Sequence, residues 1–156
     1  MSIFTDVKDL ASGKKQSKDW YREQLMYGLE SYTGGFNVGD IIFFNYGAAT
    51  EKLQFWDTYP MVLITDKNEN TGHFEGGNLH YLRPSARVSV GNMWSSGSIA
   101  YPTRCHHKYF MSNASQIYKV RPIDLQNMTP LPVEQFVLRA AGRVIEVPSS
   151  FIWSRV

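Results

Sequence analysis

The chain has 156 residues, enough for one domain, and its single cysteine, Cys105, excludes an internal disulfide and suits a reducing cytoplasm. Aromatic residues at 14% and charged residues at 19% fit a compact β-rich domain with some aromatic rings left to contact a partner. The net charge is +2, no run of 18 apolar residues predicts a membrane span, and the first residues lack the pattern of a secretion signal.

Charge falls into two blocks of opposite sign. Residues 23–75 hold eight acids against two lysines, whereas residues 76–123 hold no acid and six basic residues. Two such blocks either pair inside the molecule or present two faces of opposite sign, and both arrangements stay open. The basic residues of the second block are candidates for binding a partner: Arg83, Arg87, Arg104, Lys108, Lys119 and Arg121.

The first predicted elements are an arm and a helix. Residues 1–16 carry too little apolar surface to fold alone and are expected to form a flexible arm. From Ser17 to about Ser31 an apolar stripe at helical spacing predicts a helix, which the glycines at 34–35 end.

Three β-type runs follow, at residues 39–46, 59–65 and 78–82, each opened by a turn or break residue. In the first run, apolar side chains alternate to both sides, which predicts a strand with two apolar faces. Residues 47–58 and 66–77 are expected to be loops. The predicted shared core consists of Ile41, Phe43, Val62, Ile64, Leu79 and Tyr81.

The pattern weakens after Leu82. A helix opened by Pro84 is disfavoured by valines and Gly91, and residues 103–111 are ambiguous. Residues 117–121 predict an edge-like strand, residues 133–136 a single turn, and residues 143–147 a last strand. In the C-terminal segment 148–156, Phe151 and Trp153 either dock on a neighbouring subunit or complete the domain's own core.

Together these elements predict an α+β protein. An N-terminal helix would pack on a small, strongly curved antiparallel β-barrel of the SH3-like kind, within one domain at residues 17–147. Residues 1–16 would be its flexible arm and residues 148–156 its docking segment.

Few residues are candidates for catalysis or metal binding. Cys105-His106-His107 is the densest cluster, but the chain has no CxxC or HxxxH spacing. His80 is a candidate general base, or a histidine that bonds a neighbouring loop. We therefore expect no catalytic residue, no metal site and no cofactor.

Aromatic and basic residues are interleaved late in the chain. The pattern resembles a stacking surface for single-stranded nucleic acid, unless most of the rings belong to the core. The residues concerned are Trp94, Tyr101, Tyr109, Phe110 and Tyr118, with Arg104, Lys108, Lys119 and Arg121.

Several motifs follow one another between residues 17 and 136. They are Gly39-Asp40 with Phe43-Phe44-Asn45-Tyr46, Trp56-Asp57-Thr58-Tyr59-Pro60-Met61-Val62, Gly72 to Leu82, Cys105-His106-His107-Lys108-Tyr109, and Leu131-Pro132-Val133-Glu134-Gln135-Phe136. In this order they resemble a protein family that is found in large tailed bacteriophages of the T-even-like group. Its genes usually lie in virion assembly gene neighbourhoods. The chain departs from the family pattern in lacking Pro-Lys after Tyr46 and in a shortened helix after Pro84.

The resemblance implies a non-enzymatic structural subunit of a phage virion, in the tail, baseplate or neck, present in several copies and assembled in the host cytoplasm. Its partners would be other phage structural proteins, without any membrane. One label used in the family, DNA-end protection, supports an alternative: a nucleic-acid-binding protein that uses the basic block at residues 76–123. A second alternative is a ribonuclease-like enzyme, since the first two strands look like the small barrel of toxin endoribonucleases. Those toxins usually carry arginine where Tyr59 stands here.

Overall fold

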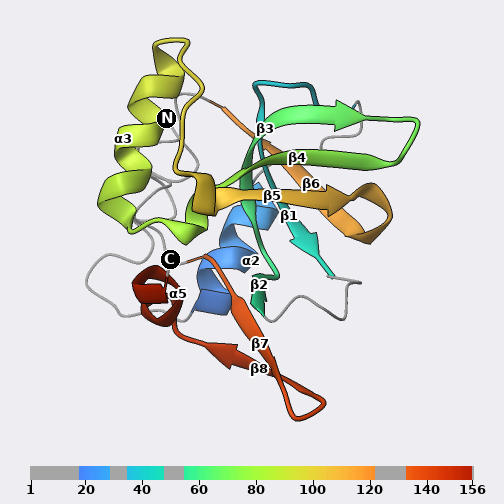
Figure 1. Cartoon of the computed structure of the whole chain (residues 1–156), viewed down its shortest axis with the longest axis vertical. Coiled ribbons are helices and arrows are strands. Elements are labelled where there is room, and N and C mark those ends of the chain that lie inside the picture. The colour runs from blue at the N-terminus through green and yellow to red at the C-terminus, as the bar shows by residue number, and fades with distance from the viewer. Residues whose placement is uncertain (1–17, 29–34, 48–54, 122–132, 156) are drawn as a thin grey trace.

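The computed structural model describes residues 18–28, 35–47, 55–121 and 133–155, and Figure 1 shows their arrangement. The strands are β1 Ile41–Tyr46, β2 Phe55–Asp57, β3 Met61–Asn68, β4 His73–Asn78, β5 His106–Phe110, β6 Ala114–Val120, β7 Phe136–Ala140 and β8 Arg143–Val147. The helices are α2 Lys18–Gly28, α3 Pro84–Ser95 and α5 Ser149–Arg155, with short 3-10 turns η1 Leu79–Tyr81, η2 Thr103–Cys105 and η3 Met111–Asn113. The α+β class predicted from the sequence is confirmed.

The strands form two antiparallel sheets. One has five strands in the order β5-β4-β3-β1-β6, and the other has three in the order β2-β7-β8. In Figure 1 the β7–β8 hairpin projects away from the larger sheet. Within the described residues neither sheet closes on itself, so the predicted SH3-like barrel is not confirmed.

Strand β1 is buried on both faces, as its alternating apolar pattern predicted. Ile41 and Phe43 face a core cluster that also contains Leu25 of α2 and Ile152 of α5. Ile42 lies in a second cluster on the other face of the sheet. The larger sheet is thus a central layer between two cores.

This layering corrects the expectation of one shared core. All six predicted core residues are buried, with at most 3% exposure. Four of them, including Leu79 and Tyr81, belong to the first cluster, whereas Val62 and Ile64 belong to the second. Their alternation along β1 and β3 sends them to opposite faces.

The strand predicted at residues 78–82 is wrong, because β4 ends at Asn78 and a 3-10 turn follows. The Asn78 side-chain oxygen accepts hydrogen bonds from the backbone N–H of His80 at 3.1 Å and of Met61 at 3.2 Å. A side chain that caps a turn in this way competes with the strand ladder, and here it wins. Asn78 thereby turns the chain toward α3.

Helix α3 forms despite its weak sequence signal. Pro84 occupies the first turn, and the helix buries Arg87, Val90 and Gly91, which lie on one side at spacings of three and four residues. Tertiary burial of this face outweighs the low helix propensity of the valines and glycine.

The smaller sheet was only partly predicted. Strand β8 at residues 143–147 is confirmed, but β2 lies where a loop was expected and β7 begins at Phe136, where a single turn was expected. The turn between β7 and β8 has positive φ at Ala141 (51°) and Gly142 (76°), the pattern of a type I′ hairpin. Alanine is uncommon there, which hid the hairpin signal.

Other expectations divide between confirmed and untested. The helix predicted from Ser17 is present as α2, and β6 is an edge strand as predicted. The predicted arm, residues 1–16, lies outside the described residues. None of the described helices has the length and apolar character needed to span a membrane.

Candidate functional site

Arg87, one of the six predicted partner-binding residues, lies inside the domain. Its side chain is 1% exposed, and its Nε donates hydrogen bonds to the carbonyl oxygens of Leu79 at 3.0 Å and Leu82 at 2.8 Å. The guanidinium also lies 3.7 Å from a carboxylate oxygen of Glu134 and against the ring of Trp153. Arg87 joins η1 to α3. The prediction that it contacts a partner does not fit this buried position.

Asp57 is the centre of a second buried polar cluster. One carboxylate oxygen accepts hydrogen bonds from the backbone N–H of Tyr59 at 2.9 Å and of Gln135 at 3.0 Å. The other lies 3.1 Å from Asn78 Nδ2 and 2.7 Å from His80 Nδ1. Burial by itself raises the pKa of Asp57, but His80 and these hydrogen bonds outweigh it, so the pKa lies below its usual value.

The Asp57 carboxylate holds the His80 ring in one orientation, as in the histidine of a general base, but His80 has no exposed surface. Its Nε2 has no hydrogen-bond partner within the described part of the chain. A general base must reach the proton that it removes, and this ring is covered. The arrangement matches the alternative prediction for His80, a histidine that bonds a neighbouring loop.

The Cys105-His106-His107 cluster does not gather into a reactive site. Cys105 is fully buried, and burial raises the pKa of its thiol to about 11, which opposes thiolate formation at neutral pH. His107 stacks on Tyr81 at 4.4 Å between ring centroids, and burial lowers its pKa. The described residues contain no group of His, Cys, Asp or Glu side chains arranged to hold a metal.

The C-terminal residues predicted to dock on a neighbour pack on their own domain. Ile152 is fully buried, and Phe151 and Trp153 are half-buried beside it. Trp153 Nε1 donates a 2.9 Å hydrogen bond to the carbonyl oxygen of His80, and Ser149 Oγ donates one of 2.7 Å to Glu134. This is the placement expected if the segment completes the domain's own core.

Three exposed basic residues lie near one edge of the larger sheet. Arg83 precedes α3, Arg104 lies on η2, and Lys108 lies on the edge strand β5. The turn η1 ends two residues before Arg83, and the turn η2 carries Arg104. These two turns contact each other. We call Arg83, Arg104 and Lys108 the β5-edge basic residues.

The remaining two basic residues lie at the opposite edge. Lys119 is on β6 and Arg121 directly follows it. Four strand spacings, about 19 Å, separate β6 from β5. Lys119 is also paired with Asp40 at 3.3 Å, a contact between the acidic and basic sequence blocks. The six predicted partner-binding basic residues therefore do not form one surface.

Most of the aromatic residues of this region are buried or engaged in contacts within the domain. Tyr109 and Tyr118 are buried, and Trp94 donates a hydrogen bond to the carbonyl oxygen of Gly39 at 2.8 Å. Phe110 packs edge-on against His73. Tyr101 is half-buried and hydrogen-bonds the exposed His106, whose ring is parallel to its own.

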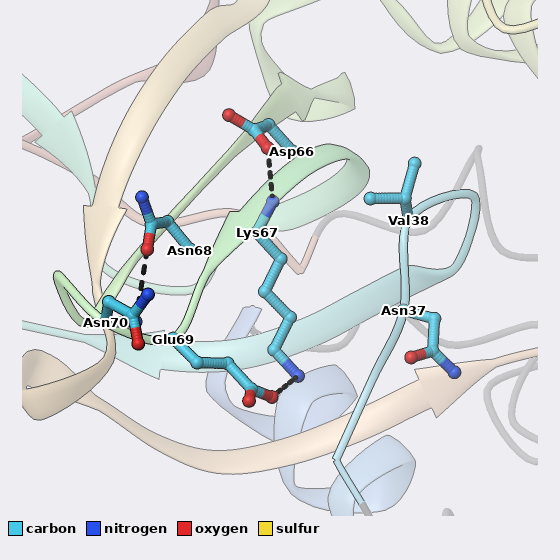
Figure 2. Close-up of a pocket in the computed structure, with 7 residues that line it drawn as sticks. All are labelled: Asn37, Val38, Asp66, Lys67, Asn68, Glu69 and Asn70. Carbon is cyan, nitrogen blue, oxygen red and sulfur yellow. Dashed lines mark hydrogen bonds and ion pairs between the residues drawn. The ribbon is translucent and has the colours of Figure 1, made fainter.

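A pocket of about 520 Å³ lies beside the β3–β4 hairpin, and Figure 2 shows its lining residues. Its lining includes the acids Asp66 and Glu69 and the cation Lys67. Lys67 is already bound to the Phe36 carbonyl at 2.8 Å and to Glu69 at 3.4 Å. With its cation engaged and two carboxylates present, this pocket does not suit a phosphate group.

Sequence reasoning missed three residues that hold the polar interior together. Arg22 of α2 donates to the carbonyl oxygens of Val133 and Glu134, which ties the helix to the segment before β7. Glu134 and Asp57 are nearly fully buried acids. Asp57 stands immediately before the turn at residues 58–60, a position where aspartate side chains often cap backbone N–H groups, and that signal was available.

Comparison with known proteins gave one match. Residues 2–93 match the model of a family described as the phage T4 terminal DNA protecting protein. This stretch is more than half of the chain; it includes Arg83, and it ends before Arg104 and Lys108. No curated protein and no solved structure matches the chain significantly.

Proposed function

Because the chain belongs to the phage T4 terminal DNA protecting protein family, we propose that it binds the ends of linear phage DNA and shields them. The family match is the observation that carries this proposal. It favours the alternative drawn from the sequence, a DNA-end-binding protein, over the structural subunit of a virion. The match gives no support to a place in the tail, baseplate or neck.

The exposed basic residues support the same function. Arg83, Arg104 and Lys108 are exposed near the β5 edge, and Lys108 forms no ion pair with the described part of the chain. Arginine and lysine side chains supply most of the affinity of proteins for the DNA backbone. We assign the phosphate contacts to the β5-edge basic residues, with Lys119 and Arg121 on the far edge as a separate group.

We propose binding without catalysis. The described histidine with the most suitable geometry, His80, is fully buried, and so is the single thiol, Cys105. Neither group has the solvent access that a reaction on a DNA end requires. The ribonuclease-like alternative therefore has no candidate among these groups, and the protein would act by covering the end.

The test compares two duplexes of one sequence, one with open blunt ends and one closed at both ends by hairpin loops. We expect tighter binding to the open duplex and slower digestion of its ends by an exonuclease. The logarithm of the binding constant should fall linearly with the logarithm of the salt concentration, with a slope of about −0.9 for each phosphate contacted. Equal affinity for the two duplexes, or affinity independent of salt, would overturn the proposal.

Matched variants locate the contacts. Replacing Arg83, Arg104 and Lys108 together with alanine should weaken binding and flatten the salt dependence by up to about 0.9 for each contact removed. Replacing Lys119 and Arg121 with alanine is the control at the opposite edge and should leave both quantities unchanged. If only the control pair weakens binding, the interface lies on β6 and our assignment to the β5 edge is wrong.

A further inference from the structure

The rings of Tyr101 and His106 lie edge to edge, with nearly parallel planes. The Tyr101 hydroxyl oxygen is 2.7 Å from His106 Nδ1, and the two ring planes differ by 10°. Their centroids are 6.0 Å apart, too far for one ring to cover the other, and the hydrogen bond joins ring edge to ring edge. We call this pair the Tyr–His platform.

One side of the platform rests on the sheet. A side-chain carbon built on Gly77 would lie 2.6–2.7 Å from three atoms of the Tyr101 ring, so the ring lies flat over a position that only glycine leaves open. His106 pairs directly with Gly77 across β4 and β5. The tyrosine hydroxyl also lies 3.4 Å from Thr65 Oγ1 on β3. These contacts fix the platform before any ligand arrives.

The other side of the platform is accessible. The His106 side chain is 41% exposed, Tyr101 is half-buried with its sheet side covered by Gly77, and residues 96–100 before it are all exposed. In Figure 1 this yellow segment runs from the end of α3 to the start of β5. An exposed aromatic surface held on a rigid sheet is the usual basis for stacking a nucleobase.

Positive charge flanks the platform. Arg104 and Lys108 lie two residues before and two residues after His106, and both are exposed. One acid is close: Glu75 has a carboxylate oxygen 3.9 Å from His106 Nε2, and it lies opposite Lys108 in the register of β4 and β5. A base on the platform would have its phosphate near the basic side chains Arg104 and Lys108.

We propose that the Tyr–His platform stacks on the outermost base of a DNA end. This inference rests on the proposed function and deepens it, because it supplies a way to recognise ends. Inside a duplex every base is covered on both faces, whereas the last base has one face free. A flat aromatic surface with basic neighbours can therefore bind at an end but not along the duplex.

The test uses blunt duplexes with 2-aminopurine, a base whose emission falls on stacking, at the last or at a central position. We expect the parent protein to change the emission of the terminal probe only. Tyr101→Leu keeps apolar cover on Gly77 but removes the ring; it should abolish that change and weaken end binding about 5- to 150-fold. Phe110→Ala, which removes a ring four residues along β5, is the control and should behave as the parent.

The outcomes separate the platform from the function. If the parent prefers open ends and Tyr101→Leu keeps both the preference and the emission change, the platform is wrong and the DNA-end function stands. If the parent shows no preference for open ends, the function itself fails. Should Tyr101→Leu melt well below the parent, His106→Ala decides by the same measurements, because that side chain is exposed.

Discussion

Asp57 joins four groups from three separate stretches of the chain. It holds the backbone of Tyr59 and Gln135 on one oxygen and the side chains of Asn78 and His80 on the other. Through them a single carboxylate links the turn before β3, the end of β4 and the segment before β7. Hydrogen bonds between buried polar groups such as these stabilise a structure, although His80 Nε2 stays unpaired among the described residues.

We expect Asp57→Asn to lower the free energy of unfolding at neutral pH by about 1–3 kcal/mol. The amide offers one acceptor oxygen in place of two and turns a donor toward existing donors. Chemical denaturation measures the loss. Asp66→Asn, an exposed aspartate on β3, is the control and should change little. Equal losses in the two variants would contradict the role given to Asp57.

The lowered pKa of Asp57 also predicts a dependence on pH. Its folded-state pKa lies below the unfolded value of about 3.9, so its stabilising contribution is present above that value and is lost as pH falls through the folded-state pKa. The parent should therefore lose stability more steeply than Asp57→Asn between about pH 5 and pH 2. Parallel pH profiles would show that other carboxyl groups dominate acid unfolding.

At the scale of elements, β1 and β3 are stabilised from both faces. Phe43 and Ile64 are fully buried in different clusters. Phe43→Ala should cost about 3–5 kcal/mol and Ile64→Ala about 2–5 kcal/mol in unfolding free energy. Denaturant titration checks both values against Val144→Ala, whose side chain is 55% exposed. If either core variant unfolds like the parent, its strand is placed incorrectly.

Helix α5 should contribute to the stability of the isolated protein. A chain ending at Ser149 loses fully buried Ile152 and the hydrogen bond from Trp153 to His80. We expect the melting temperature of this shortened chain to lie clearly below that of the parent. Trp153→Phe removes only the indole N–H, and its melting temperature should fall less. A shortened chain that melts like the parent would favour the other prediction, a segment that docks on a neighbouring subunit.

For the whole molecule, the exposed large apolar side chains do not argue for a stable oligomer. Among the described residues they are Val38, Met93, Ile99, Met111, Val144 and Ile145, spread over several elements. Stable interfaces usually need a contiguous apolar patch. We predict a monomeric or weakly associating protein, and sedimentation across a range of concentrations tests this. A dimer that persists at low concentration would contradict it.

Features that depend on neighbouring residues could be predicted from the amino-acid sequence. They are the alternation that makes β1 a two-faced strand, the edge strand β6, helix α2, the two charge blocks and the family resemblance. Local patterns carry these because side-chain direction repeats every two or 3.6 residues.

Which charged side chains are exposed, and which aromatic rings contact each other, became visible in the folded structure. Arg87 and Lys108 belong to one basic block, yet Arg87 is buried against Glu134 and Lys108 is exposed. Asp57 meets Gln135 across 78 residues, and Gly77 leaves room for Tyr101. Such contacts depend on how distant elements pack, and burial then reverses what a residue's type suggests: it makes an arginine structural and leaves a tyrosine and a histidine as a candidate binding surface.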